Sequence, residues 1–277
     1  MNLPAIAAVA SNTFKESARN RILYAIVGAT LAACGLGYVL AAISAGDDPT
    51  SMPRRLRIIA NTSLSAISLL GTLCAIFLGT NLVYQEVERK TVYTILARPI
   101  GRGEFIVGKF AGLAAVVVAA VLVMALGFAV FYALVGGIDA LSLKHAIAIF
   151  YTAVELVVVV AIALVFSSTA NPIEGAIFAF VLTLAGHATK NLDALGKEIT
   201  TPHAGVEPGA LAHVMAKVLH AIYVVLPNLE NFNLREQVTA EKPLELPMPH
   251  AEILAYAGLY TALLLAIAAF FFKRKTL

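Results

Sequence analysis

Two glycines and a lysine near the middle of the chain are spaced almost as in a phosphate-binding P-loop. In the stretch ARPIGRGEFIVGKFAG, Gly103 is followed after four residues by Gly108 and Lys109. A P-loop also needs a buried strand before it and a Ser or Thr after the lysine, whose hydroxyl binds Mg²⁺. Here Phe110 follows the lysine and leads into an apolar run, while Glu104 would place a carboxylate beside the phosphates. We therefore predict no ATPase site in this chain.

A carboxylate inside an apolar stretch is the second feature that could have a chemical role. Glu155 lies in FYTAVELVVVV, near the middle of a run long enough to cross a membrane. An ionisable group at such a position is costly and usually faces a bundle interior or a wet cavity. Two interpretations follow. Glu155 lines a translocation path or takes part in gating, or it makes an interhelical hydrogen bond in its protonated form.

The histidines and cysteines predict neither a metal site nor a catalytic site. His213 and His220 lie on one face of a predicted helix, but they are two turns apart, about 10 Å, which is too far for one metal ion. Cys34 and Cys74 fall inside apolar runs without a CxxC pair, so we interpret them as small core residues. No nucleophile and base are grouped in the sequence. The six histidines are His145, His187, His203, His213, His220 and His250.

Composition decides the class of protein that must position these residues. Hydrophobic residues make up 60% of the chain and charged residues 13%, whereas soluble domains carry roughly 25% charged residues. The apolar residues come in long runs, which are typical of membrane-spanning helices. The net charge of +3, with no basic run interleaved with aromatics, does not favour nucleic-acid binding. We predict an all-α polytopic membrane protein.

The apolar runs predict six membrane-spanning helices in a single domain, residues 1–277. Residues 1–21 precede the first span and are predicted to form an interfacial helix with a cationic face. The first run is too long for a cleaved signal peptide. The fifth is the shortest, because Pro172, Glu174 and His187 limit it. The predicted spans are residues 22–45, 58–84, 110–135, 146–166, 173–189 and 251–272.

A segment of residues 190–250 separates the last two spans and is too polar to cross a membrane. Within it, apolar residues from Ala210 to Tyr223 recur at helical spacing. Pro208 suits the start of this helix and Pro227 its end. We predict an external amphipathic helix on the surface of the bundle or of the membrane.

Lysine and arginine near the span ends predict the orientation. The cationic N-terminal segment, the loop of residues 85–109 and the basic C-terminal tail agree with one another if all three are cytoplasmic. Arg54, Arg55 and Arg57 in a short external loop argue the other way. An even number of spans with both termini in the cytoplasm fits best.

The loop of residues 85–109 is the internal loop with the highest charge density. Its charged start is followed by Val92, Ile95 and Leu96 at helical spacing, and Pro99 and Gly101 then break the helix. A short amphipathic helix that continues into spans two and three would transmit force from a soluble partner.

This loop strongly resembles the signature of type-2 ABC-transporter permeases, whose ATPase is a separate chain. The quoted match is E-x-E-R-K-T-x-Y-T-I-L-A-R-P-I-G-R-G-E-F-I-V-G-K, in which Glu88, Thr91, Leu96, Pro99, Arg102, Phe105, Gly108 and Lys109 follow the family. In that family the loop is a coupling helix that docks into a groove on the ATPase. The resemblance and the charge pattern together assign docking to Glu86, Glu88, Arg89, Lys90, Thr91, Ile95, Leu96, Pro99, Arg102 and Phe105.

The resemblance implies a set of partners. Two ATPase subunits would carry ATP and Mg²⁺, no cofactor would bind this chain, and a second copy of it would complete a homodimer in a bacterial inner membrane. The phrase VLPNLENFNLR, residues 225–235, resembles the external segment of permeases implicated in copper-enzyme maturation, such as those serving nitrous oxide reductase. A periplasmic partner at the external segment would fit that branch.

Three alternatives stay open. Arg89, Lys90 and Arg102 could anchor lipid headgroups, although the nearby acids favour docking. The chain could be an ion- or proton-coupled secondary transporter, although such proteins usually show internal repeats, and none is visible here. It could also transmit mechanical force without transporting anything.

Small residues such as the pair Gly108 and Gly112, or Gly28 with Ala32, would permit close helix contacts.

Overall fold

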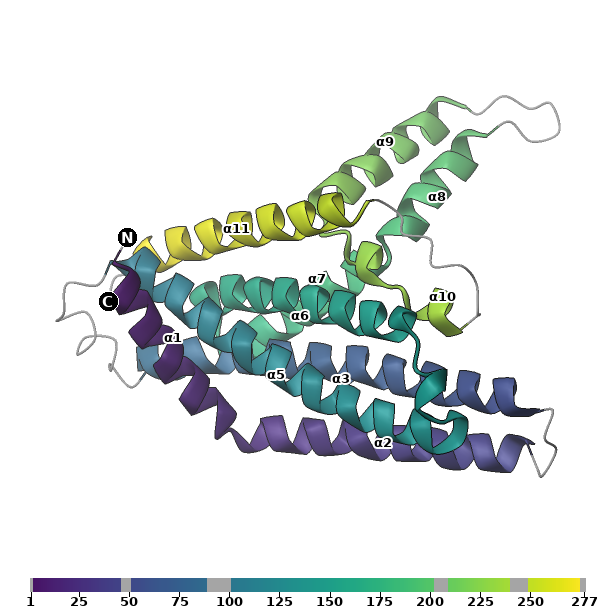
Figure 1. Cartoon of the computed structure of the whole chain (residues 1–277). Helices are drawn as coiled ribbons and strands as arrows, with labels where there is room; N and C mark the ends of the chain where they lie inside the picture. The colour runs from purple at the N-terminus through teal and green to yellow at the C-terminus, as the bar shows by residue number, and fades with distance from the viewer. Residues whose placement is uncertain (1, 46–50, 89–100, 202–208, 240–248, 275–277) are drawn as a thin grey trace.

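The chain folds as a bundle of long helices, seen in the computed structural model (Figure 1). The structure describes residues 2–45, 51–88, 101–201, 209–239 and 249–274, and no strand occurs in these ranges. This confirms the predicted all-α class. The bundle consists of α1 (Leu3–Ala18), α2 (Arg21–Ala45), α3 (Met52–Glu88), α5 (Arg102–Gly136), α6 (Leu143–Thr169), α7 (Pro172–His187) and α11 (His250–Arg274).

Helix α6 lies at the centre of the bundle. Its residues Val158 to Leu164 are each no more than 1% exposed, and the helix packs against α3, α5, α7 and α11. This explains why the stretch VVVVAIALV is apolar without interruption, because every face of the helix meets another helix. By contrast, α2 and α11 lie at the edge of the bundle and keep many exposed apolar side chains.

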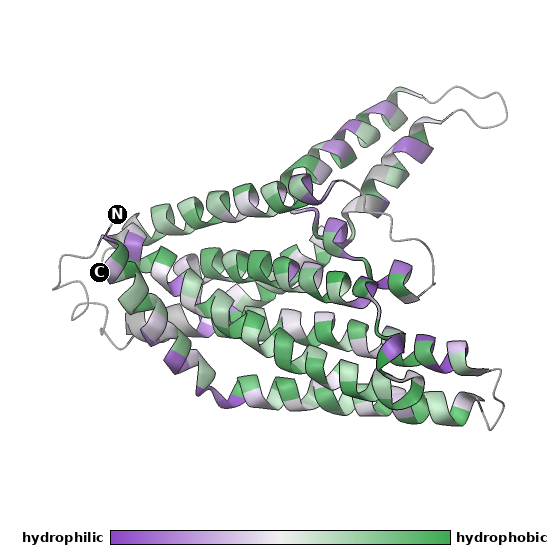
Figure 2. Cartoon of the chain, viewed as in Figure 1, coloured by the Kyte–Doolittle hydropathy of each residue, from purple (hydrophilic) through white to green (hydrophobic). Residues whose placement is uncertain are grey.

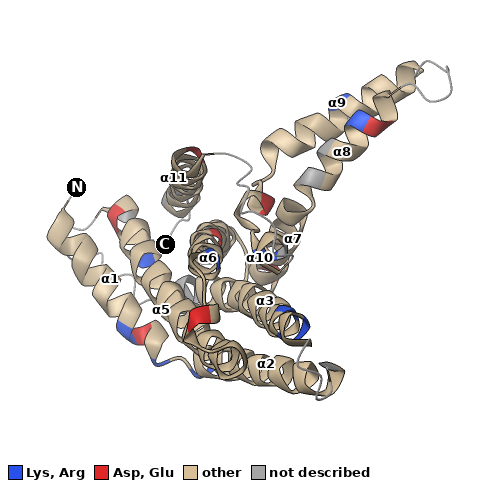
Figure 3. Cartoon of the chain, turned by 45° about the vertical axis from the view of Figure 1, so that its right-hand side comes forward, with Lys and Arg blue, Asp and Glu red and all other residues tan. Residues whose placement is uncertain are grey.

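Five described helices are long and apolar enough to cross a membrane, namely α2, α3, α5, α6 and α11. They match the predicted spans one, two, three, four and six. The predicted fifth span, 173–189, is the short helix α7, whose 16 residues measure about 24 Å against roughly 30 Å for a bilayer core. Hydrophilic residues gather at the ends of the bundle helices (Figure 2), and so do the charged residues (Figure 3).

Helix α1 packs along the first turns of α5. A Cβ added to Gly112 would lie 2.5 Å from the carbonyl oxygen of Ala10 and 2.6 Å from Cβ of Thr13. One added to Gly108 would lie 2.8 Å from Cβ of Val9. The Gly108 and Gly112 pair therefore provides the predicted close helix contact, and the helix that uses it is α1 of the same chain.

The segment between α7 and α11 differs most from its prediction. It forms α8 (Thr189–Thr200) and α9 (Ala210–Val225), which pair as a hairpin projecting away from the bundle (Figure 1). Helix α9 confirms the predicted amphipathic helix. The chain then turns back through η3 (Leu229–Phe232) and α10 (Arg235–Thr239). Leu229, Phe232 and Leu234 are at most 1% exposed, so this part of the segment packs into the bundle core.

Specific polar contacts hold this returning segment in place. The hydroxyl of Thr189 donates to Oδ1 of Asn228 at 3.0 Å, and the hydroxyl of Tyr256 accepts from the backbone N–H of Asn228 at 2.8 Å. On the α7 side, an added Cβ at Gly186 would lie 2.7 Å from the carbonyl oxygen of Pro227. The turn at VLPN is thus fastened to both α8 and α11, and the absence of a side chain at Gly186 lets the backbones approach.

A tight connection joins the end of α5 to the start of α6. Gly137 has a φ of 76°, a conformation that favours glycine, and the short helix η2 (Ile138–Ala140) follows it. The backbone N–H of Ser142 then donates to Nδ1 of His145 at 3.2 Å at the start of α6.

Candidate functional site

The predicted coupling loop leaves and rejoins the bundle at one end. Helix α3 ends at Glu88 and α5 begins at Arg102, at the same end as the start of α1 and the end of α11 (Figure 1). The helix ends that flank the loop, the start of α1 and the end of α11 therefore share one end of the bundle. Predicted docking residues outside the described ranges are Arg89, Lys90, Thr91, Ile95, Leu96 and Pro99. For Glu86, Glu88 and Arg102 the structure describes only a helical backbone.

The first turn of α5 is tied to the start of α1 by one carboxylate. Oε2 of Glu104 accepts from the backbone N–H of Gly101 at 3.1 Å, and its Oε1 accepts from the backbone N–H of Asn2 at 2.6 Å. A negative charge at a helix N-terminus also interacts favourably with the helix dipole. Glu104 thus caps α5 and joins it to a segment about a hundred residues earlier in the chain.

The same turn is also fixed to the end of α11. The ring of Phe105 stacks on the ring of Phe272 with centroids 5.6 Å apart, and Nζ of Lys109 lies 5.8 Å from the Phe105 centroid. Phe105 and Lys109 are each 1% exposed. The assignment of Phe105 as a docking residue is therefore corrected: it faces α11 inside the bundle, because that side of α5 is covered. It can act on docking only by holding the end of the loop in position.

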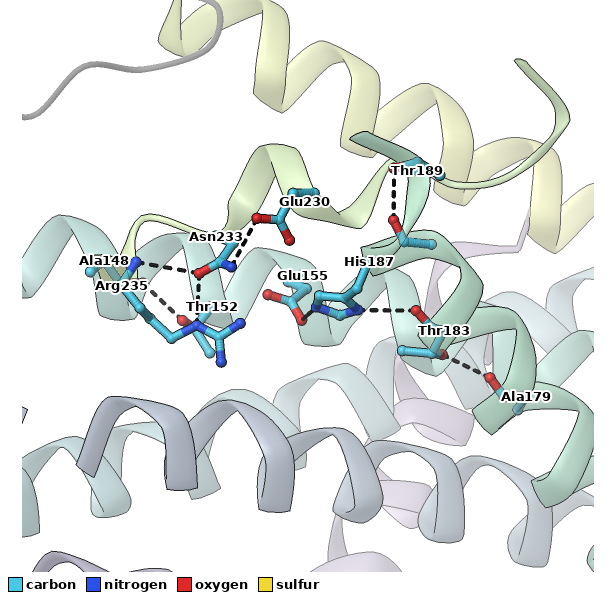
Figure 4. A network of polar contacts seen from close by, with 11 residues as sticks. Ala148, Thr152, Glu155, Ala179, Thr183, His187, Thr189, Glu230, Asn233 and Arg235 are labelled. Carbon is cyan, nitrogen blue, oxygen red and sulfur yellow. Dashed lines mark hydrogen bonds and ion pairs between the residues drawn. The ribbon is translucent and has the colours of Figure 1, made fainter. Parts of the chain in front are cut away.

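A second polar site lies between α6 and α7, where the structure gives Glu155 a partner. Oε1 of Glu155 lies 3.0 Å from Nε2 of His187, and Glu155 is 1% exposed (Figure 4). Nδ1 of His187 lies 3.0 Å from the carbonyl oxygen of Thr183, one turn earlier in α7. The short helix α7 ends at this residue, which brings its ring level with the middle of α6.

These contacts determine how many protons the pair holds. A carbonyl can only accept, so Nδ1 of His187 must carry a proton. Oε1 of Glu155 is not aligned for a linear hydrogen bond with Nε2, yet a 3.0 Å approach of two unprotonated, electron-rich atoms would be repulsive. A proton on either of the two atoms would make this contact favourable. In either arrangement the pair would have no net charge, which is the inexpensive state inside a bundle.

His187 also faces a cavity of about 190 Å³ between α3 and α7. Glu155 does not line this cavity, so it acts on the cavity only through its contact with His187. The lining residues are Ser68, Leu69, Thr72, Phe180, Thr183, Leu184, His187 and Arg235.

Arg235 brings a permanent positive charge to the cavity. Its Nε donates to Oδ1 of Asn233 at 2.8 Å, and Nδ2 of Asn233 donates to Oε1 of Glu230 at 3.0 Å (Figure 4). Glu230 lies behind Asn233 and does not line the cavity. Sequence reasoning missed both His187 and Arg235 as members of one site. The only signal in the sequence was the phrase VLPNLENFNLR, residues 225–235, which ends at Arg235.

Glu155 has a partner on the neighbouring helix. The structure provides the interhelical contact, with His187 as the partner, while a gating role stays a hypothesis. The other histidines lie elsewhere: His145 contacts Ser142 and His250 contacts the hydroxyl of Tyr151. Among the described residues no group of three or more His, Cys, Asp or Glu side chains could hold a metal ion.

Comparison with known proteins complements this geometry. No curated protein shows significant similarity to the chain. Residues 2–277 match the profile of the ABC-2 family transporter proteins, which covers nearly the whole chain. The match agrees with the bundle of long apolar helices and with the loop between α3 and α5. It does not test the copper-enzyme maturation branch. The chain belongs to the ABC-2 family of transporter proteins, as a multi-pass membrane permease subunit of an ABC transporter.

Proposed function

We propose that this chain is the permease of an exporter-type ABC transporter, which couples ATP hydrolysis on a separate ATPase subunit to substrate movement. One observation carries the proposal. The start of α5, where the coupling loop ends, is joined to α1 through Glu104 and Asn2 and to α11 through Phe105 and Phe272. A displacement of the loop would therefore move these helices together.

The lengths of the two helices attached to the loop support the same role. Helix α3 has 37 residues and α5 has 35, which corresponds to about 55 Å and 52 Å. A continuous helix is stiff along its axis, so a push at one end reaches the other end. Helix α3 also lines the cavity at His187, which gives the loop a mechanical route to that cavity.

The family match supports an ATPase partner, and we propose the rest of the assembly. In this proposal two ATPase subunits bind ATP and Mg²⁺, and two copies of this chain form the membrane part. The loop and both termini lie in the cytoplasm, and the protein resides in the inner membrane of a bacterium. The permease itself carries no hydrolytic site.

A role in mechanical work outside the membrane is a second candidate. The observation that favours it is the α8–α9 hairpin, which projects from the bundle and leaves apolar side chains of α9 uncovered. These exposed residues are Leu211, Val214, Met215, Val218 and Ile222. A periplasmic partner at this hairpin would receive the movement of the bundle.

Copurification with an ATPase tests the leading proposal. We expect a P-loop ATPase encoded beside this chain to copurify with the wild type and to dissociate from Leu96→Glu, because a charge on the apolar face of the coupling helix opposes docking. The matched control is Arg54→Glu, which changes charge at an exposed position at the opposite end of α3. The absence of any ATPase partner would contradict the proposal and favour a secondary transporter, and equal loss in both variants would contradict docking by this loop.

A further inference from the structure

Two cavities between α3 and α7 lie end to end. The first is the cavity of about 190 Å³ at His187, and the second has a volume of about 350 Å³. Phe180 lines both of them, so the two cavities are neighbours along α7, and we refer to them together as the α3–α7 groove. Together their volumes fall in the range of roughly 300–1,000 Å³ that is usual for ligand sites.

The two ends of the groove differ in chemistry. The end at His187 carries three hydroxyl side chains, an imidazole and a guanidinium, beside the apolar side chains of Leu69, Phe180 and Leu184. The remainder is largely apolar, with Thr80 and Asn81 at its far end. Its apolar walls are Leu73, Ile76, Phe77, Ile173, Ala176, Ile177 and Phe180. A polar head region thus continues into an apolar trough.

Arg235 gives the head region a permanent positive charge. Its guanidinium donates from Nε to Oδ1 of Asn233, which also accepts from the backbone N–H of Arg235. Among the described residues the terminal nitrogens of Arg235 have no partner. A guanidinium with free terminal donors binds carboxylate or phosphate oxygens well.

We propose that the α3–α7 groove binds a lipid-like amphiphile with an anionic headgroup. The headgroup contacts Arg235 and His187, and the acyl chain lies along the apolar trough. Helix α7 has 16 residues, so the groove extends for about 24 Å, longer than the roughly 15 Å that a chain covers in half of a bilayer core. As a substrate class this assignment rests on the proposed permease function, whereas the binding site itself does not depend on an ATPase.

The chain contains no tryptophan, which allows a direct binding measurement. In Phe180→Trp the only tryptophan lies in the groove. The full-length variant is placed in phosphatidylcholine nanodiscs that contain either brominated phosphatidylglycerol, which is anionic, or brominated phosphatidylcholine, which is zwitterionic. Bromine quenches tryptophan on contact. We expect half-maximal quenching at about a tenfold lower mole fraction of the anionic lipid, in keeping with a charge-assisted contact.

Matched variants identify the source of any preference. Phe178→Trp carries the same substitution two residues away, at a 52% exposed position that lines neither cavity; it should respond equally to both lipids. Adding Arg235→Gln to Phe180→Trp should remove the anionic preference, whereas adding Arg235→Lys should retain most of it. Arg54→Gln, which removes a cation elsewhere, should leave the preference unchanged.

Other outcomes overturn the inference. Equal quenching of Phe180→Trp by the two lipids means that only ordinary surrounding lipid is present. Retention of the preference in Arg235→Gln means that the headgroup is held elsewhere. If the preference is found but no ATPase copurifies with the chain, the binding site stands and the proposed function fails. If an ATPase copurifies but no preference is found, the proposed function stands and the binding site fails.

Discussion

A single residue at the end of the short helix α7 provides the partner of a buried acid in the bundle. His187 ends the helix beside Glu155 of α6, with Nε2 and Oε1 3.0 Å apart. Glu155 is 1% exposed and His187 25%, so the buried carboxyl group depends on the ring of His187 to avoid a buried unpaired charge. The contact therefore links the stability of the α6–α7 interface to the protonation of the pair.

Removing either member of this pair should destabilise the protein. We expect Glu155→Gln and His187→Gln each to lower the free energy of unfolding by about 1–3 kcal/mol, because each leaves a buried polar partner unsatisfied. In a double-mutant cycle the two effects should not add, with a coupling of about 0.5–3 kcal/mol. Thermal unfolding in detergent measures both quantities. Glu174→Gln, an exposed acid at the other end of α7, is the control, and additive effects would refute a direct contact.

The gating hypothesis for Glu155 has its own test. If protonation of the pair changes during transport, Glu155→Gln should lower substrate-stimulated ATP hydrolysis of the assembled transporter. The loss of activity should be larger than the loss expected from the lower stability of the variant, which its melting temperature measures. The same assay on Glu174→Gln gives the baseline. Unchanged turnover in Glu155→Gln would leave the residue with a purely structural role.

At the scale of elements, the close contact of α1 with α5 explains how the N-terminal helix is fixed. Gly112 and Gly108 leave room for the backbone of α1, and the Glu104 carboxylate holds the start of the same helix. The predicted interfacial helix is thus part of the bundle, with Thr13 and Ser17 fully buried.

Filling this contact should separate the two helices. We expect Gly112→Leu to destabilise the protein by about 1–3 kcal/mol, the usual effect of overpacking, because the new side chain would collide with the backbone of Ala10. Gly28→Ala on α2 is the matched control, since an added Cβ there meets nothing within 4 Å. Thermal unfolding compares the two. A Gly112→Leu protein as stable as Gly28→Ala would contradict the packing of α1 on α5.

At the scale of the whole molecule, the bundle places the end of α3 and the starts of α5 and α1 at the same end as the last turn of α11 (Figure 1). The proposed coupling to an ATPase requires that this end faces the cytoplasm. The native cysteines, Cys34 and Cys74, are at most 1% exposed, so cysteines introduced elsewhere can be labelled against a low background.

Labelling with a membrane-impermeant maleimide tests the orientation. We expect Thr91→Cys to react only in inside-out vesicles and Asp47→Cys, in the connection between α2 and α3, only in right-side-out vesicles. The physical reason is that the whole of α3, with 37 residues, lies between the two positions along the chain. Reaction of Thr91→Cys from the outer side would end the proposal that the loop is moved by a cytoplasmic ATPase.

Long apolar runs are local properties of the chain, and for that reason five spans could be predicted within a few residues at most ends. The start of α3 was misjudged, because Arg54, Arg55 and Arg57 continue the helix beyond its apolar part. Helix α9 was found for the same reason as the spans, since its periodicity is visible in the sequence. Hydropathy could not distinguish α7 from a span, because its short length depends on where the chain turns away.

The sequence by itself determined that this is an all-helical membrane protein with a charged loop between the second and third spans, because hydropathy and charge act along the chain. Only the tertiary structure decided that His187 pairs with Glu155, that Phe105 faces α11 and that residues 229–234 return to the core. Each of these contacts joins residues that are tens to hundreds of positions apart. Their proximity depends on how several helices pack at once, and no local pattern carries that information.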